Sequence, residues 1–152
     1  MKRDTKIVMA VVSAIPIVIL SASVFCAWMI SQGTSMRWRL AFRMLCHGIP
    51  ERCLEVFGVP LPICARCTGI YAGLLAGLIA FWLLPVVTER AMRIAAFIAV
   101  TPLAIDGLTQ LAQLRTSTNP LRVATGIAAG SAFGMWVLTA VERRDAARLS
   151  TS

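Results

Sequence analysis

Residues 68–77 read TGIYAGLLAG, and residues 125–134 read TGIAAGSAFG. Both segments carry glycine at every fourth position, and both open a long apolar stretch. Small residues at this spacing lie on one face of a helix, where they let two helix backbones approach closely in lipid. The repeat therefore predicts two membrane helices that run in the same direction and cross closely. It also suggests two helical hairpins related by a pseudo-two-fold axis.

The composition indicates an integral membrane protein. Of the 152 residues, 58% are hydrophobic and only 14% are charged, which is too apolar for a water-soluble domain. Four stretches are long enough to cross the hydrocarbon core of a bilayer, at roughly 7–30, 68–87, 94–114 and 123–141. We predict an all-α fold in which residues 1–152 form one membrane domain, a four-transmembrane-helix bundle.

The first apolar stretch has a second interpretation. Basic residues precede it, and Ser21-Ala22-Ser23 loosely resembles the cleavage site of a secretory signal. Because the apolar run continues well past that point, a transmembrane span is the favoured interpretation.

The formal net charge of +8 raises the question of a polyanionic partner. Lysine and arginine beside membrane spans set the topology and meet anionic lipid. No stretch interleaves basic and aromatic residues as a nucleic-acid-binding surface does. We therefore expect the lipid bilayer as partner, with anionic lipid among its components, and no nucleic acid.

The charges also bear on orientation. With four spans, both termini and the loop near residue 89 lie on one side, and the loops 31–67 and 115–122 lie on the other. The first side carries eight lysines and arginines and the second seven. Setting aside the site candidates Arg52, Arg66, Arg115 and Arg122 leaves three on the second side. The positive-inside rule then puts the termini in the cytoplasm and the loop 31–67 outside, in a bacterial inner (plasma) membrane.

The loop 31–67 is expected to contain two short helices. Residues 36–45 combine three arginines with Trp38 and two leucines, a pattern typical of an amphipathic helix at the membrane interface. A second helix should follow, with Pro50 in its first turn and Gly58 past its end. Pro62 is then placed to start the second span.

Three cysteines and the single histidine gather at this end of the second span. Cys46-His47 and Cys64-Ala65-Arg66-Cys67 offer three thiols and an imidazole, the ligand types that zinc prefers. Cys-x2-Cys at a helix start is a common metal half-site, and the helix dipole favours thiolate there. We predict a metal site of Cys46, His47, Cys64 and Cys67, with zinc favoured over iron. Adjacent Cys46 and His47 need an unusual local geometry, so Cys53 or Asp106 could replace one of them.

The third span carries one charge, Asp106. Gln110 and Gln113 follow it on the same helix face, and Asp106 lies about 12 Å from the predicted helix end at residue 114. An ionisable group at such depth usually faces the bundle interior and is a functional candidate. We expect Asp106 to act as an acid–base group, with Arg66 as a second catalytic group.

The loop 115–122 is rich in hydrogen-bonding groups and should lie beside the cysteines if the glycine-bearing spans cross. Asn119 is expected to cap the fourth helix, with Pro120 at its first position. Asn119 and Arg122, together with Arg52, are also the candidates for binding an anionic group such as a lipid phosphate.

Two other functions stay open. Cys64-x2-Cys67 at the mouth of a four-helix bundle, with Cys46 and Cys53 nearby, is also the plan of quinone-linked thiol-disulfide oxidoreductases. His47 has no necessary role in such a relay. A transporter or channel that uses Asp106 is the other possibility. A third interpretation is that the cysteines only pack as small hydrophobic residues. It does not account for the clustering of four of the five cysteines within 22 residues.

The segments 46–52 (CHGIPER) and 64–71 (CARCTGIY) resemble the domain-of-unknown-function 2085 family of small predicted membrane proteins. The resemblance covers roughly residues 40–141. It implies no particular activity, but it implies these candidate residues: Cys46, His47, Pro50, Arg52, Cys64, Arg66, Cys67, Asp106, Asn119 and Arg122. The family typically has serine where this chain has Cys53. Three cysteines with one histidine favour a metal site over a two-disulfide relay.

Overall fold

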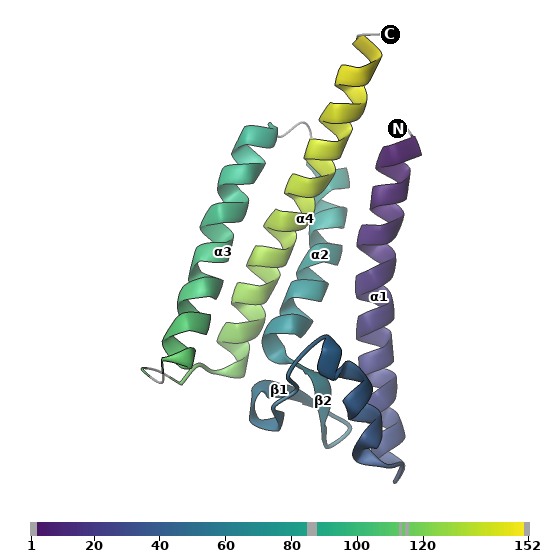
Figure 1. The fold of residues 1–152 in the computed structure, drawn as a ribbon, viewed down its shortest axis with the longest axis vertical. Helices are drawn as coiled ribbons and strands as arrows, with labels where there is room; N and C mark the ends of the chain where they lie inside the picture. Colours follow the sequence, from purple (N-terminus) through teal and green to yellow (C-terminus); the bar gives the residue numbers. More distant parts are fainter. Residues whose placement is uncertain (1–2, 85–87, 113, 115, 151–152) are drawn as a thin grey trace.

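The computed structural model describes residues 3–84, 88–112, 114 and 116–150. Its framework is four long helices that run alongside one another (Figure 1). They are α1 (Arg3–Ser31), α2 (Ala65–Leu83), α3 (Glu89–Leu111) and α4 (Asn119–Ser150). All four are long and apolar enough to cross a membrane, which confirms the predicted bundle.

The helix bounds differ from the predicted spans. α2 begins at Ala65 rather than at residue 68, and its predicted end at residue 87 lies outside the described residues. α3 begins at Glu89, ahead of the apolar stretch, because Thr88 caps it by accepting a hydrogen bond from the Ala91 N–H at 3.4 Å. α4 continues to Ser150, well beyond the predicted apolar stretch.

The glycines bring α2 and α4 into backbone contact, as the repeat predicts. A Cβ atom added at Gly69 would lie 2.5 Å from the Val123 carbonyl oxygen, and one at Gly126 would lie 2.7 Å from the Arg66 carbonyl oxygen. Added Cβ atoms at Gly73, Gly77 and Gly130 would likewise overlap a carbonyl oxygen of the facing helix. No larger residue fits at these positions, so the glycines fix how far α2 and α4 approach and at which height.

The other two helices flank this central pair. α1 packs against α2, and α3 packs against α4. Both termini lie at one end of the bundle, and the segment between α1 and α2 lies at the other (Figure 1). That arrangement is the one a four-span chain requires. The cytoplasmic location of the termini stays a prediction, which labelling of introduced cysteines in intact cells would test.

The segment between α1 and α2 departs from the all-helical expectation. The predicted interfacial helix is a 3-10 helix, η1 (Met36–Met44), and the second helix is only a turn, η2 (Pro50–Arg52). An antiparallel hairpin follows, of β1 (Cys53–Val56) and β2 (Val59–Cys64). Phe57 and Gly58 both have positive φ, 57° and 73°, and form its turn.

The predicted helix after Pro50 was wrong because Gly58 fits two roles. A glycine with positive φ ends helices, but it also occupies the tight turns of hairpins. Residues 54–63 contain three β-branched residues and two prolines, a composition that disfavours a helix. Pro62 consequently lies in β2 and does not start α2, and Cys64 is the residue that precedes the helix.

Replacing Gly73 by alanine tests the α2–α4 contact. The added methyl group would overlap the Ile127 carbonyl oxygen, so we expect Gly73→Ala to lower the unfolding free energy in detergent by about 2 kcal/mol or to prevent folding. Gly107→Ala in α3 is the matched control, because nothing lies within 4 Å of its added Cβ. It should be neutral or stabilising, by up to about 1 kcal/mol. Equal effects of the two substitutions would contradict the proposed packing.

Candidate metal site and buried polar network

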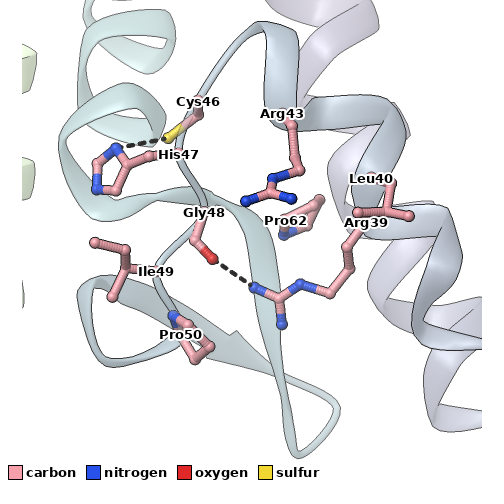
Figure 2. Close-up of a pocket in the computed structure, with 9 residues that line it drawn as sticks. All are labelled: Arg39, Leu40, Arg43, Cys46, His47, Gly48, Ile49, Pro50 and Pro62. Atoms are coloured by element: carbon pink, nitrogen blue, oxygen red, sulfur yellow. Dashed lines mark hydrogen bonds between the residues drawn. The ribbon is translucent and has the colours of Figure 1, made fainter.

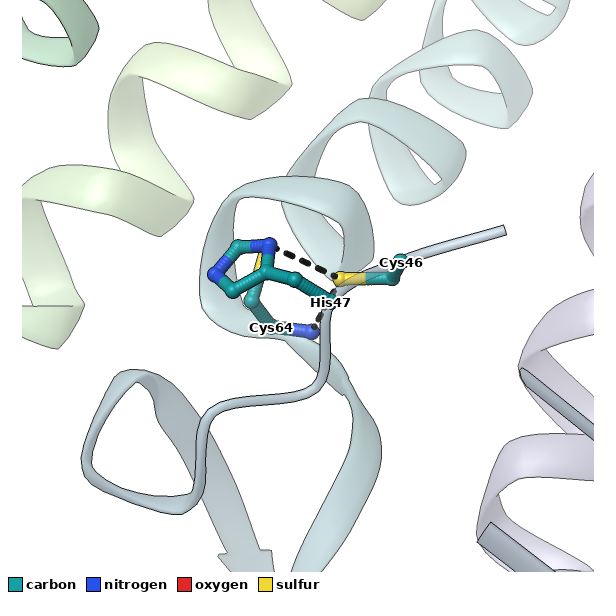
Figure 3. A group of neighbouring side chains, drawn as sticks. All are labelled: Cys46, His47 and Cys64. Carbon is teal, nitrogen blue, oxygen red and sulfur yellow. Dashed lines mark hydrogen bonds between the residues drawn. The ribbon is translucent and has the colours of Figure 1, made fainter. Parts of the chain in front are cut away.

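Three metal-ligating side chains meet where the segment before η2 touches the start of α2 (Figure 3). The sulfur atoms of Cys46 and Cys64 and a ring nitrogen of His47 all lie within 4.8 Å of one another. The Cys46 sulfur is 3.8 Å from His47 Nδ1. Tetrahedral zinc with ordinary bond lengths would separate two sulfurs by about 3.8 Å, and a sulfur and a nitrogen by about 3.6 Å. The adjacent pair Cys46 and His47 is therefore already close to ligand geometry.

Cys67 lies beside this group. It follows Cys64 by nearly one helical turn, and it packs against the buried cluster that contains Cys46 and Cys64. Cys46 and Cys64 are buried, whereas His47 is exposed and Cys67 is half-buried. Of the four predicted ligands, Cys46, His47 and Cys64 thus form a group that could hold a metal ion, and Cys67 packs beside it.

Backbone geometry around Gly48 makes this arrangement possible. Gly48 has φ of 56°, and a Cβ atom there would lie 2.8 Å from the Pro62 carbonyl oxygen. The chain can therefore turn sharply after His47 while it lies against β2. Arg39 of η1 holds the turn from the other side, since its Nη2 donates to the carbonyl oxygens of Gly48 at 3.2 Å and Leu61 at 3.1 Å.

The hydrogen bonds of the loop cysteines separate their roles. The Cys46 sulfur accepts from the Cys64 N–H at 3.2 Å. Hydrogen bonds from the side chains of Cys64 and Cys67 and from the backbone hold the pKa of Cys46 well below its ordinary value, so Cys46 favours thiolate. Burial raises the pKa of Cys53 to about 11, and its S–H donates to the Ile49 carbonyl oxygen at 3.1 Å. Cys53 is therefore a poor source of thiolate.

Behind the cysteines, Arg66 and Asp106 join α2 to α3. Arg66 Nε donates to Asp106 Oδ2 at 3.0 Å, and Arg66 Nη2 donates both to the same carboxylate oxygen and to the Asp106 carbonyl oxygen, the latter at 3.3 Å. Asp106 is only 4% exposed. α3 ends at Leu111 rather than at residue 114, so Asp106 lies about 8 Å from the helix end rather than the expected 12 Å.

The network continues from Asp106 to α4. Gln110 Nε2 donates to Asp106 Oδ1 at 3.3 Å, and Gln110 Oε1 accepts from Arg122 Nη2 at 3.4 Å. Arg122 Nη1 donates to Asn119 Oδ1 at 2.6 Å, and Asn119 Nδ2 donates to the Cys53 carbonyl oxygen at 3.0 Å. Arg122 is buried, and its Nε has no hydrogen-bond partner among the described residues. Hydrogen bonds thus run from α2 through α3 and α4 to β1.

Several predicted residues occupy other roles than expected. Asn119 does not cap α4, because both ends of its side-chain amide bind Arg122 and Cys53 instead. Arg52 is half-buried in η2 and lies within electrostatic range of Arg122. Arg115 and Gln113 lie outside the described residues.

Two residues have roles in the structure that their sequence positions do not predict. Gln110 was noted for its helix face, but its link from Asp106 to Arg122 required knowing which spans adjoin. Arg39 belongs to the helix predicted at the membrane interface, yet its guanidinium donates to two backbone carbonyls of the loop. Its three-residue spacing from Phe42, which packs against the buried cysteines, was the available sequence signal.

The fold and the site together define an integral membrane protein of four apolar helices with a Cys/His group, at one end of the bundle, that could hold a metal ion. The sequence profile of the predicted membrane protein family DUF2085 matches residues 46–136, which include the cysteine group, the polar network and both glycine repeats. The chain belongs to this family.

Two archaeal relatives match a similar part of the chain. A protein of Methanothermobacter thermautotrophicus is 43% identical over 102 residues, covering 67% of this chain and 90% of the relative. A protein of Methanocaldococcus jannaschii is 37% identical over 99 residues, covering 64% of each. Both are described as uncharacterised proteins. No solved structure matches the chain.

A double-mutant cycle tests the Arg66–Asp106 pair. Asp106→Leu alone leaves half-buried Arg66 beside Arg122 without its carboxylate, so we expect a loss of about 3 kcal/mol in unfolding free energy. Arg66→Met with Asp106→Leu removes both charges and should cost clearly less than the two single substitutions added together, by at least about 1 kcal/mol. Thermal unfolding in one detergent measures all three variants. Additive effects would show that the pair does not couple α2 to α3.

Proposed function

We propose that the protein holds a zinc ion through Cys46, His47, Cys64 and Cys67 and uses it to build a binding site for an anionic ligand at one face of the membrane. The observation that carries the proposal is the convergence of three ligand atoms within 4.8 Å. Cys67 is the fourth ligand in the proposal because it packs against the buried cluster of Cys46 and Cys64 and completes the Cys-x2-Cys motif. A closed tetrahedral centre of this kind acts as a cross-link and needs no open coordination position.

Charge balance supports a three-thiolate centre. Asp106 carries one negative charge, whereas Arg66 and Arg122 carry one positive charge each, so the buried network has a surplus positive charge. Zinc with three thiolates and a neutral imidazole has a net negative charge of one. Arg122 lies within electrostatic range of Cys64. The proposed centre and the network would therefore neutralise each other in a medium where an uncompensated charge is costly.

In this proposal the residues of the polar network hold helices and the loop in position and do not take part in a reaction. Asp106 and Arg66 were expected to act in catalysis, but their mutual hydrogen bonds favour holding α2 and α3 in register. Both ends of the Asn119 side-chain amide are already hydrogen-bonded: Oδ1 accepts from Arg122, and Nδ2 donates to the Cys53 carbonyl oxygen. Of the three residues expected to bind an anionic group, Arg122 keeps one buried N–H, its Nε, without a hydrogen-bond partner among the described residues.

The quinone-linked thiol-disulfide relay fits the geometry less well. Such a relay needs two cysteine pairs that exchange electrons through thiolates. Cys53 would have to pair with Cys46, yet its thiol is buried, is bound to the Ile49 carbonyl oxygen, and has its pKa raised to about 11. The single Cys64-x2-Cys67 motif would then have no partner pair.

The membrane that holds the protein is proposed to be a plasma membrane. Both relatives come from archaea, so a bacterial inner membrane has no support from them. Half-buried Arg66 and buried Arg122 both belong to the polar network. This supports leaving them out of the positive-inside count and keeps the termini on the cytoplasmic side in the proposal.

Zinc content under reducing conditions tests the proposal. We expect about one zinc per chain in the purified protein and a loss of zinc in Cys64→Ser, because serine does not replace a thiolate ligand. Cys53→Ser is the matched control. It makes the same atomic change within the same loop but outside the ligand group, so it should keep its zinc.

Two results would contradict the proposed zinc centre or its ligand set. A metal-free wild-type protein with a Cys64–Cys67 disulfide found by mass spectrometry would contradict the zinc centre and favour the relay. Equal zinc in Cys64→Ser and the wild type would also overturn the proposed ligand set.

A further inference from the structure

A pocket of about 330 Å³ lies between η1 and the segment that carries Cys46 and His47 (Figure 2). η1 supplies Arg39, Leu40 and Arg43, the chain from Cys46 to Pro50 forms the opposite wall, and Pro62 of β2 closes one side. The two walls are thus a helix expected at the membrane interface and the loop with two of the proposed zinc ligands. Its size is at the lower end of small-ligand sites.

Two arginines give one side of the pocket a positive charge. Two guanidinium groups line it, and no carboxylate is among its lining residues. Arg39 is fixed in place by its bonds to the carbonyl oxygens of Gly48 and Leu61. Arg43 is exposed, extends toward the loop in Figure 2, and makes no hydrogen bond with any residue that the structure describes. Arg39 therefore helps to form the pocket wall, whereas the guanidinium N–H groups of Arg43 are available to bind a ligand.

The surroundings narrow the class of ligand. Trp38 and Met44 of η1 are 59% and 96% exposed, an apolar surface that suits the headgroup region of a bilayer. Phosphate is the abundant anion at that depth, and guanidinium groups match its geometry with paired hydrogen bonds. An apolar ligand would leave both guanidinium groups without a counter-charge.

We propose that this pocket binds a phosphate group, with Arg43 as its main ligand and Arg39 as a fixed second charge. The inference deepens the proposed function, because it locates the anionic ligand at the loop that the zinc ion would hold in place. It moves that ligand away from Arg122, whose donors mostly serve the buried network. A phospholipid headgroup and free phosphate share this chemistry.

Inorganic phosphate is the first probe, used with the full-length zinc-loaded protein in a maltoside detergent, which carries no phosphate. Isothermal titration should show binding to the wild type that weakens about tenfold or more in Arg43→Gln, since a charge-assisted hydrogen bond is lost. Arg37→Gln is the matched control. Arg37 is an exposed arginine of the same helix that does not line the pocket, so its removal should change affinity less than about twofold.

Lipid nanodiscs separate the two sources of phosphate. If the ligand is a headgroup, native mass spectrometry should find phosphatidate retained by the wild type and by Arg37→Gln but lost from Arg43→Gln, whether or not free phosphate binds. If it is free phosphate, the titration should be positive and lipid retention should not depend on Arg43. Either pattern supports a phosphate site. Equal losses in the two arginine variants, or no phosphate-dependent binding in either assay, would overturn it.

Zinc analysis of the same samples keeps this inference distinct from the proposed function. Zinc present at one per chain without any Arg43-dependent phosphate binding contradicts the pocket alone. Phosphate binding that depends on Arg43 in a chain without zinc contradicts the zinc centre alone. Unchanged zinc content and unfolding temperature in Arg43→Gln exclude misfolding as the reason for lost binding.

Discussion

The backbone contact between α2 and α4 is the constraint on which the rest of the structure depends. Gly126 leaves room for the Arg66 carbonyl oxygen, and Gly69 leaves room for that of Val123. The first turns of α2 and α4 therefore lie side by side, at the same level along the bundle axis. Arg66 and Arg122 are carried on those turns, so α3 can link them through Asp106 and Gln110. A wider separation of the helices would leave these charges in the membrane without partners.

A second consequence concerns the loop between α1 and α2. The hairpin pairs Cys53 with Cys64 and ends at the first turn of α2, while Asn119 of α4 binds the Cys53 carbonyl oxygen. The loop is thus attached to both glycine-bearing helices. In the proposed function, zinc adds a third attachment by joining Cys46 and His47 to Cys64 and Cys67. A rigid loop of this kind can hold a charged pocket open at the membrane face, where headgroups and solutes both have access.

Sequence reasoning succeeded where a pattern is local and its chemistry has one meaning. Glycine at every fourth position within an apolar stretch predicted the α2–α4 contact. The cysteines beside His47 indicated the group of Cys46, His47 and Cys64 that could hold a metal ion. It failed at Gly58, because a glycine past a short segment suits a helix end and a hairpin turn equally. It could not pair Asp106 with Arg66, since that pairing depends on the rotation of α3 about its own axis. The role of Arg39 was hidden because an arginine on an amphipathic helix has the same pattern whether it faces lipid or protein.

X-ray absorption at the zinc edge of the purified protein tests the central claim most directly. A centre formed by Cys46, His47, Cys64 and Cys67 predicts a first shell of three sulfur atoms at about 2.3 Å and one nitrogen at about 2.0 Å. A first shell made of nitrogen and oxygen alone, or a protein that binds no zinc under reducing conditions, would contradict it.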